Sequence, residues 1–280
     1  MTRLRRAIDE AAGTLAQAGV DSAQVDAELL AAHTARVDRG LLAFHEPDER
    51  FYDSYRNVVD ARARRIPLQH LTTSAAFGTV VLEVGPGVFI PRPETESLLE
   101  WALGQRLSPT PVIIDLCTGS GALAVALADG SPRAHVVAVE DSADALRYAR
   151  RNCKGRDVEL IDADVTDPRL LGERDGTVDL VVSNPPYIPD GAALEPEVAE
   201  HEPAHALFGG PDGMRVIGPI VTLAARLLRP GGFVGVEHDD DTAALTVDLF
   251  ESSGAFTEVT SRRDLAGRPR FVTATRTGSG

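Results

Sequence analysis

The sequence has little lysine, little cysteine and an excess of acidic residues. Of its 28 basic residues only Lys154 is a lysine, and 42 acidic residues outnumber them, which gives a net charge of −14. A strongly acidic chain is a poor candidate for gripping a nucleic-acid backbone, because that task needs a basic surface. The two cysteines, Cys117 and Cys153, provide no disulfide framework, which is typical of a reducing compartment.

Long apolar runs are also missing. No stretch approaches the roughly 20 apolar residues that a membrane span needs, and the first 21 residues lack the apolar segment of a signal peptide. His33, His45 and His70 are scattered without metal-ligand spacing. We therefore predict a cytoplasmic protein with no metal site, no membrane association and no stable nucleic-acid binding, and we expect a monomer.

Residues 1–72 have a helical pattern. Leu4, Ile8 and Leu15 recur at helical spacing, and Gly19 closes that segment. Arg62, Arg64 and Arg65 could form a docking face, but a charge run of this kind usually faces solvent. We expect residues 1–72 to form a separate helical domain.

The period changes between residues 73 and 90. Two apolar stretches, Thr79–Val84 and Val88–Ile90, flank the sequence Gly85-Pro86-Gly87, which is typical of a β-hairpin. We predict a hairpin linker at 73–90.

Strands and helices then alternate over residues 91–276, which predicts an α/β domain with a mainly parallel sheet, helices on both faces and an antiparallel edge hairpin. Residues 189–213 have the composition of a long loop, and 277–280 that of a disordered tail. The expected strands are 112–116, 135–140, 158–161, 178–182, 233–238, 256–260 and 270–275, and the expected helices are 97–107, 119–129, 142–152, 214–228 and 242–252.

A rigid elbow follows the strand predicted at 178–182. Asn184 precedes two prolines, which can neither donate to a sheet nor continue a helix, and Tyr187 follows them. One interpretation is a plain proline turn. The other is a clamp for a planar NH2 group, in which the Asn184 amide and the Pro185 carbonyl accept hydrogen bonds and Tyr187 supplies a flat wall.

A glycine-rich segment, Asp115–Gly121, joins the strand at 112–116 to the next helix, and Glu140 follows Gly121 by nineteen residues. An acid at that place bonds ribose hydroxyls in doubly wound folds. The pattern fits a nicotinamide dinucleotide, S-adenosylmethionine or a purely structural turn. Asp115 favours S-adenosylmethionine, because a carboxylate suits a cationic ligand and opposes a pyrophosphate. Asp164 is placed to accept a hydrogen bond from an adenine amino group.

Taken together, these segments resemble the release-factor glutamine methyltransferases, the HemK/PrmC family. The matching stretches are Pro91–Glu96 (Pro-Arg-Pro-Glu-Thr-Glu), Asp115–Gly121, Glu140 and Ser183–Tyr187. The resemblance spans about residues 66–275, and the helical front is similar to that family's substrate-docking domain. It implies a class I S-adenosylmethionine-dependent methyltransferase fold, Rossmann-like with a seven-stranded sheet, and a glutamine side-chain amide as methyl acceptor.

The resemblance also implies a protein partner, with a peptide chain release factor as the main interpretation. The alternatives are a glutamine of another protein such as a ribosomal protein, an exocyclic amine of a nucleobase, a nicotinamide-dependent oxidoreductase and a non-catalytic cofactor-binding protein. Cys117, Val165 and His238 depart from the family's usual residues and favour a divergent branch.

The site residues expected from these arguments fall into three groups. The catalytic group comprises Asn184, Pro185 and Tyr187. The cofactor group comprises Asp115, Cys117, Thr118, Gly119, Ser120, Gly121, Glu140, Asp164, Val165 and Asn184, and the substrate group comprises Arg92, Thr95, Asn184, Pro185, Pro186 and Tyr187.

Overall fold

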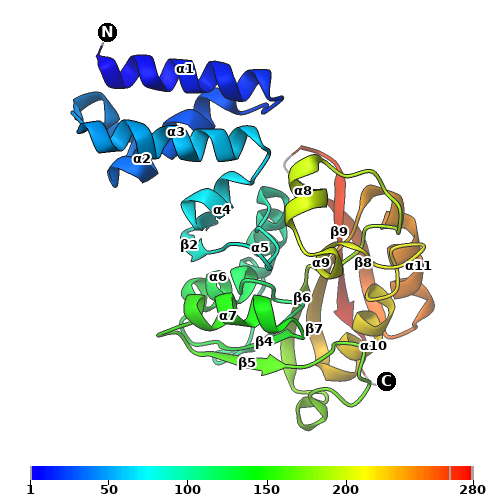
Figure 1. Ribbon diagram of the computed structural model, residues 1–280. Coiled ribbons are helices and arrows are strands. Elements are labelled where there is room, and N and C mark those ends of the chain that lie inside the picture. Colours follow the sequence, from blue (N-terminus) through cyan, green and yellow to red (C-terminus); the bar gives the residue numbers. More distant parts are fainter. Residues whose placement is uncertain (1, 265, 279–280) are drawn as a thin grey trace. The chain divides into compact units, whose positions relative to one another are not determined.

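The computed structural model describes residues 2–264 and 266–278 (Figure 1). The chain forms two compact units. The helical unit is Met1–Ser74 together with Leu194–His201, and the sheet unit is Ala75–Ala193 together with Glu202–Gly280. A stretch from the middle of the chain thus joins the helical unit, which the expected domain 1–72 did not include.

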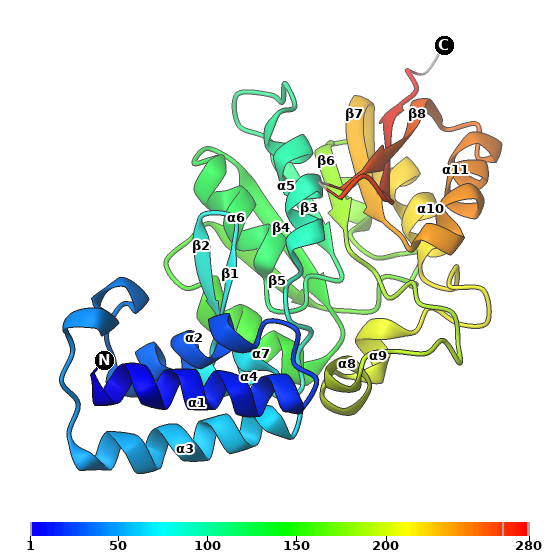
Figure 2. The ribbon, with the colours of Figure 1, turned by 90° about the horizontal axis from the view of Figure 1, so that it is seen from above.

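The helical unit is built on apolar helix faces. Helix α1 (Arg3–Gln17) buries Leu4, Ile8 and Leu15, and begins where the Thr2 hydroxyl accepts the Arg5 N–H at 3.2 Å. Figure 2 shows α1 and α3 side by side, and both contact α2. The other elements of this unit are α2 (Ala23–Ala35), the 3-10 helix η1 (Arg39–Phe44), α3 (Glu49–Ala63), α4 (Leu68–Thr72) and α8 (Pro196–His201).

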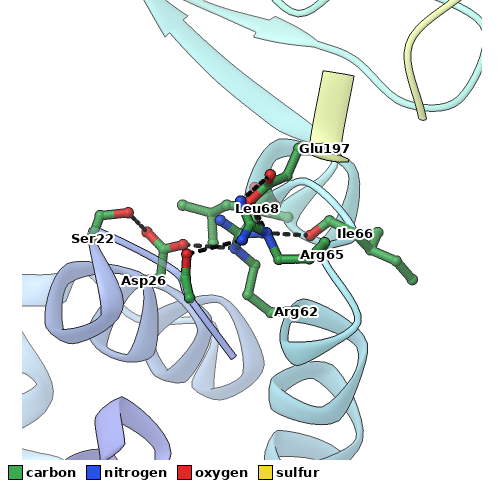
Figure 3. A network of polar contacts seen from close by, with 9 residues as sticks. Ser22, Asp26, Arg62, Arg65, Ile66, Leu68 and Glu197 are labelled. Atoms are coloured by element: carbon green, nitrogen blue, oxygen red, sulfur yellow. Dashed lines mark hydrogen bonds and ion pairs between the residues drawn. The ribbon is translucent and has the colours of Figure 1, made fainter. Parts of the chain in front are cut away.

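Helix α8 lies within 189–213, for which the sequence predicted an uninterrupted loop. That prediction was wrong, because the segment contains both α8 and the short helix α9 (Ala204–Leu207). Glu197 on α8 accepts hydrogen bonds from Arg62 Nη1 at 3.0 Å and Arg65 Nε at 2.6 Å (Figure 3). These partners lie 135 and 132 positions away in the sequence. Arg62 is therefore buried rather than part of a solvated face.

The sheet unit contains the predicted mainly parallel sheet. In the described part of the chain seven strands pair in the order β5-β4-β3-β6-β7-β9-β8. The pairs among β5, β4, β3, β6 and β7 are parallel, and β9 pairs antiparallel with both β7 and β8. The strands are β3 (Val112–Leu116), β4 (His135–Glu140), β5 (Val158–Asp162), β6 (Val178–Ser183), β7 (Leu228–Glu237), β8 (Phe256–Arg263) and β9 (Pro269–Arg276).

Helices cover both faces of this sheet. Because side chains alternate along a strand, Ile113 and Leu180 belong to one apolar core, whereas Ile114 and Val181 belong to the other. The first core includes buried residues of α5 (Glu96–Leu103), α6 (Ala122–Gly130) and α7 (Ala143–Asn152), and the second includes those of α10 (Ile217–Leu227) and α11 (Ala243–Ser252). The short 3-10 helices are η2 (Pro93–Thr95), η3 (Gly172–Arg174) and η4 (Asp240–Thr242).

The hairpin predicted around Gly85-Pro86-Gly87 is displaced toward the N-terminus. The observed two-stranded sheet pairs β1 (Ser74–Phe77) with β2 (Val80–Glu83), and Gly78 has a left-handed backbone, with φ of 54°. Val88–Ile90 is not a strand. The Ile90 N–H instead donates to the Glu202 carboxylate at 3.3 Å, so a distant side chain takes the place of a strand partner.

Strand β7 begins at Leu228, five residues earlier than the sequence predicted. Leu228 pairs with Val178, and a shift of register between Val178 and Leu180 accommodates the Pro-Gly-Gly segment that was expected only to stop a helix. At the other terminus, residues 279–280 of the predicted tail lie outside the described residues. Thr277 is held, because its N–H donates to the Ala255 carbonyl at 2.9 Å.

The parallel pairing decides where chemistry can occur. The carboxyl ends of β4, β3, β6 and β7 are neighbours, so Glu140, Asp115, Ser183 and Glu237 lie along one edge of the sheet. None of the helices within 2–264 and 266–278 is both long and apolar enough to cross a membrane.

Candidate active site

The segment between β3 and α6 winds tightly because three of its residues have left-handed backbones. The φ angles of Cys117, Gly119 and Gly121 are 61°, 59° and 85°. A Cβ at Gly121 would lie 3.3 Å from Cys153 Sγ, so this glycine allows α7 to pack closely. A Cβ at Gly119 would meet no atom within 4 Å, so the backbone there is open to a ligand. Because of these turns, α6 begins at Ala122, three residues later than the predicted start at 119.

Asp115 is fully buried at the end of β3. Its Oδ2 accepts the Thr118 hydroxyl and the Ala124 N–H, the latter at 3.1 Å, and so ties the loop to α6. Burial raises the pKa of Asp115 to about 7, although the two hydrogen bonds lower it. The other oxygen, Oδ1, is buried without a partner among the described residues. It is therefore available to a donor on a ligand.

Glu140 shapes the same loop from the end of β4. Its two carboxylate oxygens accept the Gly119 N–H at 2.7 Å and the Ser142 N–H at 3.0 Å. Burial raises the pKa of Glu140, and these two hydrogen bonds oppose the effect. Each oxygen keeps a further lone pair, so the carboxylate can still accept a hydroxyl.

A cavity of about 580 Å³ lies along this edge of the sheet. Of the predicted cofactor residues all but Gly121 line it, and of the predicted substrate residues Thr95, Asn184 and Pro186 do so. Asp164 is exposed at the cavity and accepts the Thr166 N–H at 2.8 Å, while Val165 is buried in the wall. The lining residues from the predicted set are Thr95, Asp115, Cys117, Thr118, Gly119, Ser120, Glu140, Asp164, Val165, Asn184 and Pro186.

The proline elbow at the end of β6 is held from both sides. The Ser183 hydroxyl donates to the Leu116 carbonyl at 2.7 Å, which joins the elbow to the end of β3. Beyond the elbow, Ile188 N–H donates to the Leu207 carbonyl and Gly209 N–H to the Ile188 carbonyl, both at 2.9 Å. Gly213 permits this packing, because a Cβ there would lie only 2.2 Å from the Tyr187 carbonyl oxygen.

The Asn184 side chain lines the cavity. Its Nδ2 donates to Thr95 Oγ1 at 3.1 Å, and Thr95 itself is buried. No donor in the described part of the chain reaches Asn184 Oδ1, and none donates from the backbone to the Pro185 carbonyl. Asn184 Oδ1 is therefore an unused acceptor at the cavity, whereas Pro185 is buried and does not line it.

Three of the expected substrate residues do not line the cavity, namely Arg92, Pro185 and Tyr187. The Tyr187 hydroxyl donates to Glu237 Oε1 at 2.9 Å, and burial raises its pKa well above the usual value. Arg92 pairs through Nη2 with Glu202, which is buried, and its guanidinium lies 4.8 Å from the centre of the Phe89 ring. The side chains of Tyr187 and Arg92 are both engaged in contacts within the sheet unit.

Sequence reasoning missed several residues near the site. Asp141, His205 and Arg215 line the cavity, and Glu237, which does not line it, is a buried acid bonded to Tyr187. It closes the apolar run of β7 and is 1% exposed. Burial raises the pKa of Glu237 to about 7, although the hydrogen bond from Tyr187 and the positive charge of Arg270 lower it. The signal was available, because an acid that ends a buried strand is the pattern that identified Asp115 and Glu140. The next residue, His238, is buried with a lowered pKa because of that burial, and its Nδ1 donates to the Asp239 carbonyl at 2.8 Å.

Comparisons with known proteins show the family of this chain. The families described as PrmC N-terminal domain and Methyltransferase small domain match residues 6–72 and 94–206. Proteins named release factor glutamine methyltransferase from Mycolicibacterium smegmatis and Mycobacterium tuberculosis (strain H37Rv) are 66% and 62% identical over 99% and 98% of this chain, and over 99% and 92% of their own.

A solved structure shares the fold. It is a Thermus thermophilus 16S rRNA methyltransferase in complex with AdoMet and guanosine. The match covers 72% of this chain and 49% of that chain, at 25% identity and a TM-score of 0.50. The two relatives above 60% identity match nearly the whole length of this chain. The chain therefore belongs to the release factor glutamine methyltransferase family.

Proposed function

We propose that this chain transfers a methyl group from S-adenosylmethionine to the side-chain amide nitrogen of a glutamine in a peptide chain release factor. The observation that carries the proposal is the position of Asn184. Its amide lines the cavity beside the cofactor loop and keeps an oxygen free of partners in the described part of the chain. The names of the relatives at 66% and 62% identity support the same substrate.

The residues around the loop fit S-adenosylmethionine better than a dinucleotide. Asp115 Oδ1 is a buried acceptor without a partner among the described residues, which suits an ammonium group and would repel a pyrophosphate. Glu140 would accept the ribose hydroxyls, and Gly119 would let the ligand approach the backbone. Asp164 and Val165 would hold the adenine. When bound, the cofactor supplies an electrophilic methyl group on a sulfonium.

The acceptor nitrogen needs positioning, because an amide lone pair is delocalised into its carbonyl and is a poor nucleophile. In the proposed mechanism Asn184 Oδ1 and the Pro185 carbonyl accept the two N–H groups of the glutamine. This aims the nitrogen at the methyl group, and orientation of this kind can contribute up to roughly 7–11 kcal/mol. The same acceptors stabilise the positive charge that grows on nitrogen during the transfer. The excess proton then leaves to water.

Roles for the other predicted residues follow from their contacts. Pro186, which lines the cavity, would provide the wall for the glutamine stem. Tyr187 would act through Glu237 rather than as that wall, because its hydroxyl is bonded there. Arg92, paired with Glu202, would hold the chain that leads to Thr95.

The helical unit would dock the protein substrate. Its match to the PrmC N-terminal domain supports this role. So does the apolar surface of η1, where Leu41 is 53% and Phe44 is 85% exposed, since exposed apolar side chains grouped on one element favour contact with a partner.

The decisive experiment supplies the purified chain with methyl-labelled S-adenosylmethionine and one candidate acceptor at a time. We expect label on a release factor, mapped by mass spectrometry to one glutamine, and no label on a release factor in which that glutamine is replaced by alanine. Separate reactions with ribosomal proteins and with RNA test the alternative acceptors. Label confined to one of those would contradict the proposed substrate, and calorimetric binding of NAD without binding of S-adenosylmethionine would contradict the proposed cofactor.

A further inference from the structure

We infer that Asn152 is a positioning residue for the cofactor, because its side chain joins the cofactor loop to strand β2. The cofactor loop is residues 117–121, between β3 and α6. The inference rests on the proposed binding of S-adenosylmethionine. It concerns three places in the sheet unit that are far apart in the sequence, namely Asn152 at the end of α7, Glu83 at the end of β2 and Ser120 in the cofactor loop.

The Asn152 amide uses both its donor end and its acceptor end. Its Oδ1 accepts the Glu83 N–H at 2.8 Å, and its Nδ2 donates to the Glu83 carbonyl at 3.0 Å and to the Ser120 carbonyl at 2.8 Å. Because an N–H faces one end and two carbonyls face the other, only one orientation of the amide satisfies all three contacts. The side chain is therefore a fixed link between residues that lie 69 and 32 positions before it.

The Ser120 carbonyl depends on this link. Ser120 is 2% exposed and lines the cavity. The first hydrogen bond of α6 runs from the Val125 N–H to the Gly121 carbonyl at 2.8 Å, so the Ser120 carbonyl lies one residue too early to accept from the helix. A buried carbonyl without a partner is costly. Asn152 supplies the donor that the helix does not.

The peptide group between Ser120 and Gly121 is thereby bonded on both sides. Its carbonyl accepts from Asn152, and its N–H, which is that of Gly121, donates to the Thr118 carbonyl at 2.9 Å. Glycine lets a neighbouring peptide group rotate at little steric cost, so these hydrogen bonds select its orientation in the cavity wall. Without Asn152 the loop would populate other conformations. The apparent affinity for a ligand falls with the fraction of the chain that has the binding conformation.

The other end of the link secures a second part of the cavity wall. After Glu83 the chain continues to residues 87–89, which line the cavity. The Tyr148 hydroxyl donates to the Pro86 carbonyl at 3.3 Å, so α7 contacts this segment as well. Asn152 bonds to both the loop and the strand, and we expect the two parts of the wall to respond together when the cofactor binds.

The first test measures the Kd of S-adenosylmethionine by calorimetry for two substitutions. Asn152→Ala removes the link, and we expect Kd to rise by about 5-fold, as for loss of one hydrogen bond. Asn152→Asp keeps the acceptor for the Glu83 N–H but sets a carboxylate against two carbonyls, and Kd should rise by about 10-fold or more.

Kinetics with an intact release factor separate positioning of the cofactor from a general loss of structure. With S-adenosylmethionine saturating, kcat of Asn152→Ala should stay within about 2-fold of the wild-type value, because the acceptor clamp at Asn184 is unchanged. The KM for S-adenosylmethionine should rise, whereas the KM for the release factor should not.

Arg151→Ala is the matched control. Arg151 precedes Asn152 on α7 and pairs with the Glu83 carboxylate at 3.0 Å, but within residues 2–264 and 266–278 it makes no hydrogen bond to the cofactor loop. We expect this variant to bind S-adenosylmethionine with the wild-type Kd. The melting temperature of each variant shows whether the fold is retained.

Hydrogen exchange on the wild-type chain tests the same link without a substitution. Glu83 does not line the cavity, and its N–H is bonded to Asn152. Saturating S-adenosylmethionine should slow exchange at the Glu83 N–H as well as at the Gly121 N–H. In Asn152→Ala the cofactor should slow exchange at Gly121 alone.

The results that would overturn the inference differ from failure of the proposed function. A wild-type Kd for both Asn152 variants would overturn it, as would an equal rise in Kd for Arg151→Ala. Unchanged exchange at Glu83 in the wild-type chain saturated with cofactor would overturn it too. If the wild-type chain did not bind S-adenosylmethionine, the proposed cofactor would be wrong and the inference would fall with it. Binding without methylation would remove only the proposed substrate, and the Kd values would still decide the role of Asn152.

Discussion

Two glutamates, Glu197 half-buried and Glu237 buried, show how differently the two units use the same side chain. Glu197 belongs to the helical unit and lies between Arg62 and Arg65 (Figure 3). Although burial raises its pKa, the hydrogen bonds from these arginines lower it to about 2. Glu237 belongs to the sheet unit and accepts a hydrogen bond from the Tyr187 hydroxyl. The positive charge of Arg270 lowers its pKa, but burial outweighs this and raises the pKa to about 7. Glu197 is therefore ionised at neutral pH, whereas Glu237 titrates near pH 7.

This difference distinguishes a carboxylate that stabilises the fold from one that has the properties of a functional group. In the network around Glu197 the charged side chains have partners of opposite charge. Arg62 also pairs with Asp26 at 2.7 Å, and Asp26 accepts the Ser22 hydroxyl at 2.8 Å. Such a network fixes a segment in place. Glu237 has one carboxylate oxygen without a partner among the described residues and lies at the end of β7, next to the strand that leads to Asn184. A buried acid with a raised pKa in such a place is expected of a functional site.

Arg62→Ala should have the largest effect on stability. It leaves Asp26 without its buried cation and removes one of the two arginines from Glu197. Breaking a buried ion pair from one side costs about 3–5 kcal/mol. Hydrogen exchange on the full chain should show this loss in the helical unit. Arg56→Ala, which alters an exposed arginine of the same helix, is the control and should change stability by less than about 0.5 kcal/mol.

The pH dependence should have opposite signs in the two units. The pKa of Glu197 is lowered to about 2, so its contribution is present above roughly pH 4.3, the usual pKa of glutamate, and is lost as the pH falls toward 2. That loss is about 3 kcal/mol. The pKa values of Glu237 and Asp115 are raised to about 7, so the sheet unit should lose stability as the pH rises from roughly 4 to 7.

Unfolding in urea across this pH range, followed unit by unit with hydrogen exchange, checks both slopes. Glu197→Gln should flatten the acid slope of the helical unit alone, and Glu237→Gln should flatten part of the slope of the sheet unit. Equal effects of either substitution on both units would show that the two carboxylates are not independent.

Glu237→Gln should leave stability unchanged or raise it. At pH 8 the wild-type chain carries the cost of ionising Glu237, which the amide does not. We therefore expect unchanged stability or a gain of up to about 2 kcal/mol. Thermal unfolding at pH 8 and at pH 5 measures this, and the gain should be smaller at pH 5. A loss above about 2 kcal/mol at pH 8 would mean that Glu237 is a structural residue.

Tyr187→Phe should have the smallest effect of these substitutions. It removes the hydrogen bond to Glu237 Oε1, and the carboxyl can compensate by taking up a proton. We expect a further rise in the pKa of Glu237 and a loss of stability of about 1 kcal/mol. A loss of activity far larger than that of Glu237→Gln would instead give the Tyr187 hydroxyl a direct role in the reaction.

The sequence was sufficient for the succession of strands along the chain and for the turn after β3, because these depend on local signals. Apolar runs that end in Asp115, Glu140 and Ser183 predicted strands whose carboxyl ends meet, and the structure brings these ends together. Glycines and prolines predicted the turns at the same edge.

Long-range contacts explain what the sequence could not give. Tyr187 was expected to face the substrate, but its orientation depends on Glu237, fifty positions later. Arg92 is bound by Glu202, 110 positions later. Helix α8 is held by Arg62, 135 positions earlier. A local pattern shows that a side chain is unusual, whereas the partner that orients it is set only by the fold.

The measurement that tests the central claim most directly is the methylation rate of Asn184→Ala with S-adenosylmethionine saturating and an intact release factor as acceptor. The substitution removes an acceptor and leaves Asp115, Glu140 and the cofactor loop in place. We predict unchanged cofactor affinity by calorimetry and a rate lower by about 10²-fold or more, as for loss of one transition-state hydrogen bond. A wild-type rate would show that the elbow is only a structural turn and that the acceptor amide binds elsewhere.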